Sequence, residues 1–321
     1  MTTRRTFVAG SLAAAAALAL PFSARAQSRS ARIRTKDSAE LHVKEWGTGG
    51  RTVIFTHAWP LSADIWDYQA VALAEAGYRV LAYDRRGFGR SSQPAAGYDF
   101  DTLSDDLAAV IAVAGARDIT LAGYSMGGGE IVRYFSRHGG RHVAKAALVG
   151  AAASYLLKTD ANPDGLDRAV FDGIKHGVQG DRKSYLAGLL SDVFFDAKRP
   201  ATNPVTPATI EWTLGIAMQA GLHATVACVD SFGLTDFRPE LASVTVPTLL
   251  LWHRRHPGAH RLGSHHRPRH SAVDHDRICG RVSRAGGHRA RPRHPRSSGL
   301  SRKLSRPAAF AADAPVMHGE Q

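Results

Sequence analysis

The feature of this sequence that most constrains its fold is a series of continuous apolar runs, each of strand length, between Ala31 and Trp252. Segments with helical spacing of apolar residues separate these runs. Strands that are apolar on both faces need cover on both sides, which a parallel sheet flanked by helices provides. The pattern therefore predicts an α/β fold. The strands are expected at 52–57, 78–84, 118–125 and 143–152, and the helices at 68–76, 101–115 and 127–138.

This alternation stops at Ser154. Helical pieces around Phe171, Tyr185 and Trp212 follow, and prolines separate them. We expect a helical cap inserted over one end of the sheet, followed by one more core strand that begins at Pro247. The predicted organisation is a first part of the core in 27–153, the cap in 154–239 and the last recognisable core strand in 240–253.

The N-terminal residues 1–26 have the pattern of a targeting segment. Arg4 and Arg5 precede an apolar run that reaches Phe22, and a small-x-small site ends at Ala26. This resembles a twin-arginine signal peptide. A transmembrane anchor fits less well, because the run is short, rich in alanine and contains Pro21. We expect cleavage after Ala26 and export to the periplasm or the medium, with no membrane anchor left.

The strongest chemical signal is Gly-Tyr-Ser-Met-Gly at residues 123–127. A serine nucleophile must stand clear of the sheet, and a sharp turn from strand to helix achieves this when small residues lie two positions before and after it. Gly123 and Gly127 occupy those positions between an expected strand and an expected helix. A glycine-rich turn without chemistry is the alternative. A phosphate-binding loop is disfavoured, because no Lys-Ser or Lys-Thr follows. We predict that Ser125 is the nucleophile.

When a serine attacks a carbonyl group, the tetrahedral oxyanion that forms also needs two backbone N–H donors. Met126 offers one at the positive end of the following helix, and Trp59 offers the other in the loop after strand 52–57. His57 begins the same loop. We expect it to shape the loop rather than act as the base, because in this arrangement the base follows the nucleophile in chain order.

Several long stretches carry a resemblance to a known family. They are THAWPLSADIWDYQ, GYRVLAYDRRGFGRSSQP, GYDFDTLSDDLAAVI, LAGYSMGGGEIVRYFSRHG, LLKTDANPDG and TDFRPELASVTVPTLLLWH. Together, over about residues 40–253, they resemble the cofactor-free (non-haem) haloperoxidase and arylesterase branch of the α/β-hydrolase superfamily. The resemblance implies a mostly parallel sheet with helices on both faces and a helical cap.

The resemblance also implies a serine esterase that acts on small esters and needs no cofactor and no metal. Such an enzyme also makes peracids from short carboxylic acids and hydrogen peroxide, and the peracid oxidises halide. Two residues depart from the family pattern. Ala58 replaces a glycine before Trp59, and Tyr124 replaces a histidine before Ser125; we expect these changes to shift substrate preference.

A third departure begins after His253. The family continues with a Gly-Asp turn bearing the catalytic acid, then a helix, a strand, a Gly-x-x-His-Gly turn bearing the base, and a closing helix. None of these is recognisable in residues 254–321, which contain fourteen arginines and no periodic apolar pattern. Residues 1–252 carry a net charge of +2, and residues 253–321 carry +11. The sequence therefore predicts an α/β-hydrolase fold that lacks its C-terminal strand and helices and ends in a basic tail.

One extra base directly after the His253 codon would explain this tail. Each later triplet then takes the last base of one original codon and the first two of the next. Around Arg255, the original codons then permit Gly-Asp-Thr-Gln-Val-Pro-Ile-Asp. From Asp274 to Gly286 they permit Thr-Met-Ile-Glu-Tyr-Ala-Gly-Gly-Ser-His-Gly-Leu, with the His codon spanning Ser283 and Arg284. We predict a frame-shifted tail, with the acid near Arg255 and the base near Ser283 in the restored frame.

Other interpretations of the tail are weaker. His253, His256 and His260 have helical spacing, but prolines break such a helix and no cysteine or carboxylate completes a metal site. A nucleic-acid-binding tail has the charge, but it has no aromatic residue before Phe310 on which a base could stack. We expect no metal and no specific nucleic acid, only adventitious binding of polyanions.

Two function hypotheses remain open. The first is an exported serine esterase or perhydrolase, acting on a small ester or carboxylic acid and impaired by loss of its acid and base. Asp230, Asp236 or a tail histidine would replace them only by a coincidence of geometry. The second is a catalytically dead relic that binds polyanions through its basic tail.

Overall fold

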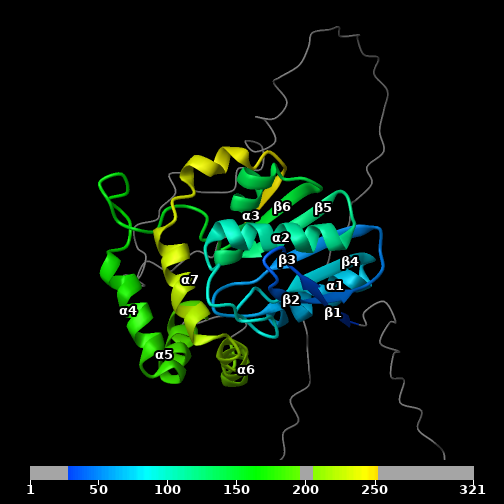
Figure 1. The fold of residues 1–321 in the computed structure, drawn as a ribbon. Coiled ribbons are helices and arrows are strands. Elements are labelled where there is room, and N and C mark those ends of the chain that lie inside the picture. Colours follow the sequence, from blue (N-terminus) through cyan, green and yellow to red (C-terminus); the bar gives the residue numbers. More distant parts are fainter. Residues whose placement is uncertain (1–27, 196–204, 252–321) are drawn as a thin grey trace, which may run out of the picture. The chain divides into compact units, whose positions relative to one another are not determined.

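The computed structural model describes residues 28–195 and 205–251 (Figure 1). All of them belong to one compact unit. The predicted signal peptide, residues 1–26, and the predicted frame-shifted tail, residues 254–321, lie outside the described residues. Both therefore stay predictions, as do the acid and base sites near Arg255 and Ser283.

A seven-stranded sheet forms the centre of the fold, in the order β1-β2-β4-β3-β5-β6-β7. The five strands from β4 to β7 run parallel, and the hairpin β1-β2 joins β4 antiparallel. The mostly parallel sheet predicted from the apolar runs is confirmed. The strands are β1 (Ser28–Arg34), β2 (Glu40–Trp46), β3 (Arg51–Thr56), β4 (Tyr78–Tyr83), β5 (Ile119–Tyr124), β6 (Val143–Val149) and β7 (Thr248–Leu251).

Helices cover both faces of this sheet. Residues of α2 (Phe100–Ala114) and α3 (Met126–His138) pack in a core cluster with one set of alternating strand residues, among them Ile54. The short 3-10 helix η2 (Ala63–Trp66) and α1 (Asp67–Glu75) pack in a separate cluster with the other set, among them Val53 and Phe55. Within the described residues β7 is the last strand of the sheet. The predicted loss of the C-terminal strand and helices concerns residues 254–321 and stays a prediction.

The insertion between β6 and β7 is helical, as predicted. The predicted pieces around Phe171, Tyr185 and Trp212 lie in α4, α5 and α6, and the structure adds a further helix, α7, that was not predicted. These elements are α4 (Arg168–Gln179), α5 (Arg182–Leu189), η3 (Leu190–Phe194), α6 (Pro207–Met218), α7 (Leu222–Leu234) and the 3-10 helix η4 (Arg238–Ser243). In Figure 1 helices α4 to α7 lie together beside the sheet.

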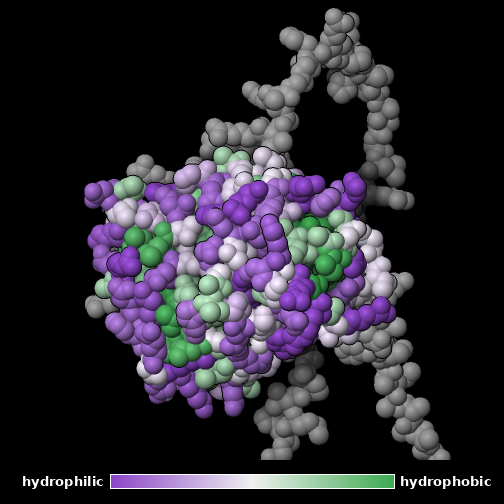
Figure 2. Space-filling model, viewed as in Figure 1, coloured by the Kyte–Doolittle hydropathy of each residue, from purple (hydrophilic) through white to green (hydrophobic). Residues whose placement is uncertain are grey.

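One face of the described residues has a mostly polar surface. Figure 2 shows one face on which hydrophilic residues predominate and hydrophobic residues form small separate patches. No single helix of the described residues is long and apolar enough to cross a membrane; α6 and α7 meet the criterion only as a pair, bent by 99°.

Candidate active site

Ser125 lies on a sharp turn between β5 and α3. Its φ of 51° and ψ of −117° place it at positive φ, which is strained for a residue with a side chain. Three backbone hydrogen bonds hold the turn. The Ser125 N–H donates to Val149 O, and its carbonyl accepts from the N–H groups of Gly128 and Ala152, each at 2.9 Å. The structure therefore provides the strand-turn-helix context that the motif requires.

The glycines of the motif lie where the backbone leaves no room for a side chain. A Cβ at Gly123 would lie 2.6 Å from the carbonyl oxygen of Gly127, and a Cβ at Gly127 would lie 2.4 Å from Thr56 Oγ1. The Thr56 hydroxyl itself donates a hydrogen bond of 2.9 Å to that same Gly127 carbonyl. The start of α3 is thus pressed directly against the end of β3.

Replacing Gly127 with alanine will destabilise the fold. We expect a loss of about 1–3 kcal/mol, because the added methyl group meets backbone and side-chain atoms of Thr56 in a packed site. Gly173→Ala in α4 is the matched control, since its Cβ would meet nothing within 4 Å. There the same change should be neutral or stabilising by up to about 1 kcal/mol. Urea unfolding of the two variants tests this, and equal stabilities would contradict it.

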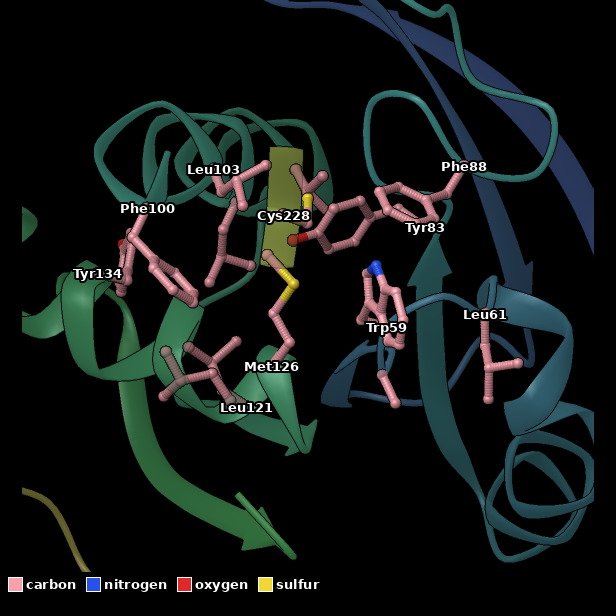
Figure 3. Packing of buried hydrophobic residues seen from close by; sticks show 14 of the residues in the cluster. Trp59, Leu61, Tyr83, Phe88, Phe100, Leu103, Leu121, Met126, Tyr134 and Cys228 are labelled. Atoms are coloured by element: carbon pink, nitrogen blue, oxygen red, sulfur yellow. The ribbon is translucent and has the colours of Figure 1, made fainter. Parts of the chain in front are cut away.

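The turn at Ser125 and the loop after β3 leave the sheet side by side. Strands β3 and β5 are parallel neighbours, and Thr56 pairs in register with Gly123. The structure thus brings the loop of Trp59 next to Ser125 and Met126. Figure 3 shows the side chains of Trp59 and Met126 within one packed cluster, together with Tyr83.

Among the described residues, the backbone N–H groups of both predicted oxyanion donors have no hydrogen-bond acceptor. Met126 is the first residue of α3, so its N–H has no acceptor within the helix. Within the described part of the chain, neither this N–H nor that of Trp59 donates a hydrogen bond. The Trp59 side chain is fixed separately: its indole N–H donates to Thr225 O of α7 at 2.8 Å, and its ring packs against Phe232.

His57 supports the loop that contains Trp59. Its buried ring accepts a hydrogen bond at Nε2 from the Arg85 backbone N–H, at 2.9 Å, and its Nδ1 lies 3.0 Å from Ala58 O. Burial, together with the positive charge of Arg85, holds the pKa of His57 well below its ordinary value. A neutral ring that donates from Nδ1 satisfies both contacts. This geometry agrees with the predicted loop-shaping role of His57.

A buried ion pair, which was not predicted, joins this loop to α3. The guanidinium of Arg85 donates to the carboxylate of Glu130 and, at 2.9 Å, to the carbonyl of His57. Both charged side chains are fully buried. The Tyr83 hydroxyl also donates to Glu130, and burial, reinforced by this carboxylate, raises the pKa of Tyr83 well above its ordinary value. One network therefore connects the helix that begins at Met126 with the loop before Trp59.

No base for Ser125 is found in the described part of the chain. No described histidine is hydrogen bonded to its hydroxyl; His57 is engaged as above, His138 contacts Asp105, and His223 contacts Ala95 O.

The two aspartates considered as substitutes are engaged elsewhere. Asp230 pairs with Lys175 at 2.9 Å, and Asp236 pairs with Arg238 at 2.7 Å. The structure therefore brings together Ser125, the motif glycines and the two N–H groups, and the residues it describes place no acid or base beside them.

A serine on a turn between a strand and a helix of a mostly parallel sheet is typical of α/β hydrolases. The sequence comparisons confirm that this chain belongs to that class. Residues 51–254 match the family described as the α/β-hydrolase fold, and the chain belongs to this family. The matched segment ends at residue 254, beside the position where the family pattern stops in the sequence.

The relatives narrow the assignment to the haloperoxidase branch. The chain is 42% identical to a non-heme chloroperoxidase of Kitasatospora aureofaciens. The alignment spans 217 residues and covers 68% of this chain and 78% of that protein. It is 37% identical over 220 residues to a bifunctional esterase/perhydrolase of Acinetobacter calcoaceticus, covering 68% and 79%. The crystal structure of a bromoperoxidase from Bacillus anthracis superposes with a TM-score of 0.65 at 39% identity, covering 69% of this chain and 80% of that one.

Proposed function

We propose that Ser125 is the nucleophile of a serine ester hydrolase. This proposal rests on the serine at positive φ at the start of α3, beside two N–H groups that donate no hydrogen bond to the described residues. The Ser125 Oγ attacks the ester carbonyl carbon and loses its proton to a base, and the carbonyl oxygen becomes an oxyanion held by the N–H groups of Trp59 and Met126. The alcohol then leaves with a proton, and Ser125 carries the acyl group as an ester.

Two acceptors complete the proposed reaction. Water attacking the acyl group releases a carboxylic acid, whereas hydrogen peroxide releases a peracid. A peracid then transfers one oxygen atom to a halide ion, which gives hypohalite and returns the carboxylate. The relatives named as chloroperoxidase and as esterase/perhydrolase support this pair of outcomes. None of these steps requires a cofactor.

Aromatic side chains favour small esters with an aryl group as substrates. Tyr124, the residue before Ser125, packs its ring edge-on against Phe194 of η3, with ring centroids 6.4 Å apart. Trp59 packs against Phe232 of α7 at 5.4 Å. Rings from the core and from the cap thus flank the strand ends beside Ser125. Offset and edge-on contacts of this kind stabilise a bound aromatic ring.

We further propose that the chain is exported by its N-terminal segment and that its catalysis is impaired. Without a base, the Ser125 hydroxyl remains a weak nucleophile at neutral pH. The frame-restored chain, translated after removal of one base following the His253 codon, would supply the acid and the base. The end of the family match at residue 254 supports this position for the shift.

Covalent labelling tests the role of Ser125. An activated serine oxygen attacks the phosphorus of a fluorophosphonate, forms a P–O bond and displaces fluoride, while the hydroxyl proton passes to the base. Peptide mass spectrometry then locates the adduct. We expect the frame-restored chain to carry one adduct, on Ser125, and the chain as it stands to react far more slowly. Ser125→Ala should abolish labelling, whereas Ser30→Ala, at an exposed serine of β1, should not. Labelling that persists in Ser125→Ala would refute the assignment.

A further inference from the structure

Strand β7 ends the sheet with an exposed apolar edge. It pairs with β6 on one side, and no strand of the described residues pairs with its other side. Leu249, Leu250 and Leu251 are 51%, 44% and 46% exposed, and Leu241 in the preceding η4 is 43% exposed. Because successive strand residues point to opposite faces, the described residues leave both faces of β7 partly exposed as well as its edge.

The outward-facing backbone groups of β7 belong to Thr248 and Leu250. The carbonyl of Pro247 accepts a hydrogen bond from Ala146 N, and that of Leu251 accepts one from Gly150 N, so these two residues face β6. Backbone groups alternate in direction along a strand, which turns those of Thr248 and Leu250 outward. The missing N–H of Pro247 falls on the inner side, and it therefore does not block pairing at the outer edge.

The other edge of the sheet has the opposite character. Strand β1 carries Arg29, Arg32 and Arg34 within seven residues, so two such edges would repel each other. The segment 244–251, which leads into and contains β7, has no charged residue. Charges, prolines that remove outward N–H groups and bulges are the usual protection of an edge strand. Among the described strands, β7 is thus the edge that is suited to pair with an identical copy of itself.

We propose that two copies of this chain associate through their β7 edges. Two identical strands related by a two-fold axis must pair antiparallel, so Thr248 and Leu250 of each copy exchange hydrogen bonds with the other. The sheets of the two copies become continuous, and the exposed leucines of β7 cover one another. The arginines of β1 leave the outer ends of this joined sheet unsuited to further pairing, so the assembly closes at two copies. This association is independent of any chemistry at Ser125.

Analytical ultracentrifugation of the full chain over a range of concentrations tests the association. We expect the mass to rise from that of one chain, 34.5 kDa, to twice that value. Leu250→Lys should keep the protein monomeric, because it places two like charges at the joined edge. The matched control is Val113→Lys, the same kind of change at a valine of α2 that is 60% exposed, and this variant should still dimerise.

Hydrogen exchange gives a second measurement that needs no variant. The amides of Thr248 and Leu250 should become protected as the concentration rises, while exposed amides of β1 keep exchanging. Three results would overturn the proposal: a monomer at every concentration, growth into species larger than two chains, or protection of the two amides in the monomer. The last result would mean that another part of the same chain covers the edge.

Discussion

Removing one base directly after the His253 codon will raise the turnover of an aryl acetate on the order of a millionfold. A serine hydrolase that lacks its base loses about this factor, since the hydroxyl nucleophile and the base act as one unit. The chain as it stands keeps Ser125 and the N–H groups of Trp59 and Met126. We therefore expect residual turnover about 10³–10⁴-fold above the uncatalysed rate, from these N–H groups and substrate binding alone.

The comparison needs both chains purified under the same conditions and the same aryl acetate. Ser125→Ala in the frame-restored chain is the control, and it should return turnover to the level of the chain as it stands. Equal turnover in the two chains would contradict the claim that the shifted frame removes the base of Ser125. Such a result would mean that the described residues or the tail already supply a base that the structure does not place at Ser125.

Replacing Arg85 with methionine is expected to destabilise the fold by about 3–5 kcal/mol, because it leaves the carboxylate of Glu130 buried without its counter-charge. The carbonyl of His57 also loses its donor. Urea unfolding monitored by circular dichroism measures the change. Glu130→Met added to Arg85→Met removes the unpaired charge, so the double variant should be more stable than the single one.

A surface arginine provides the matched control for this experiment. Arg137 pairs with Asp101 and Asp105 on α2, and its side chain is 37% exposed. Solvent screens such pairs, so Arg137→Met should cost no more than about 1 kcal/mol. If Arg85→Met cost no more than Arg137→Met, the buried pair would not be the link between α3 and the loop of Trp59 that the structure suggests.

The parallel core was predictable because its strands are apolar on both faces. Strand β2 lacks this property: its buried and partly exposed residues alternate, and only Ile33 of β1 is buried. No continuous apolar run therefore marks this antiparallel hairpin. Helix α7 was missed for a different reason. It buries small and polar residues, such as Ala224 and Thr225, against the cap and the core, so its sequence lacks a clear apolar stripe.

The site was predictable where its geometry is local. The turn at Ser125 depends on Gly123 and Gly127, which stand within two residues of it, so the motif shows both the turn and the serine. The pair of Arg85 and Glu130 joins residues 45 positions apart. The sequence showed only a charged residue just after an apolar strand and another on an expected helix. Their contact emerges only from the packing of α3 on the strand ends.

The nucleotide sequence between the codons of Leu249 and Gly286 shows directly whether the reading frame shifts after His253. The amino-acid sequence leaves several bases open at each original codon, and the DNA sequence settles all of them. We expect that the reading frame displaced by one base after His253 encodes Gly-Asp near Arg255 and a Gly-x-x-His-Gly-like turn at Ser283, with no stop codon between them. A stop codon in that frame, or any other residue at the predicted aspartate or histidine codon, would contradict it.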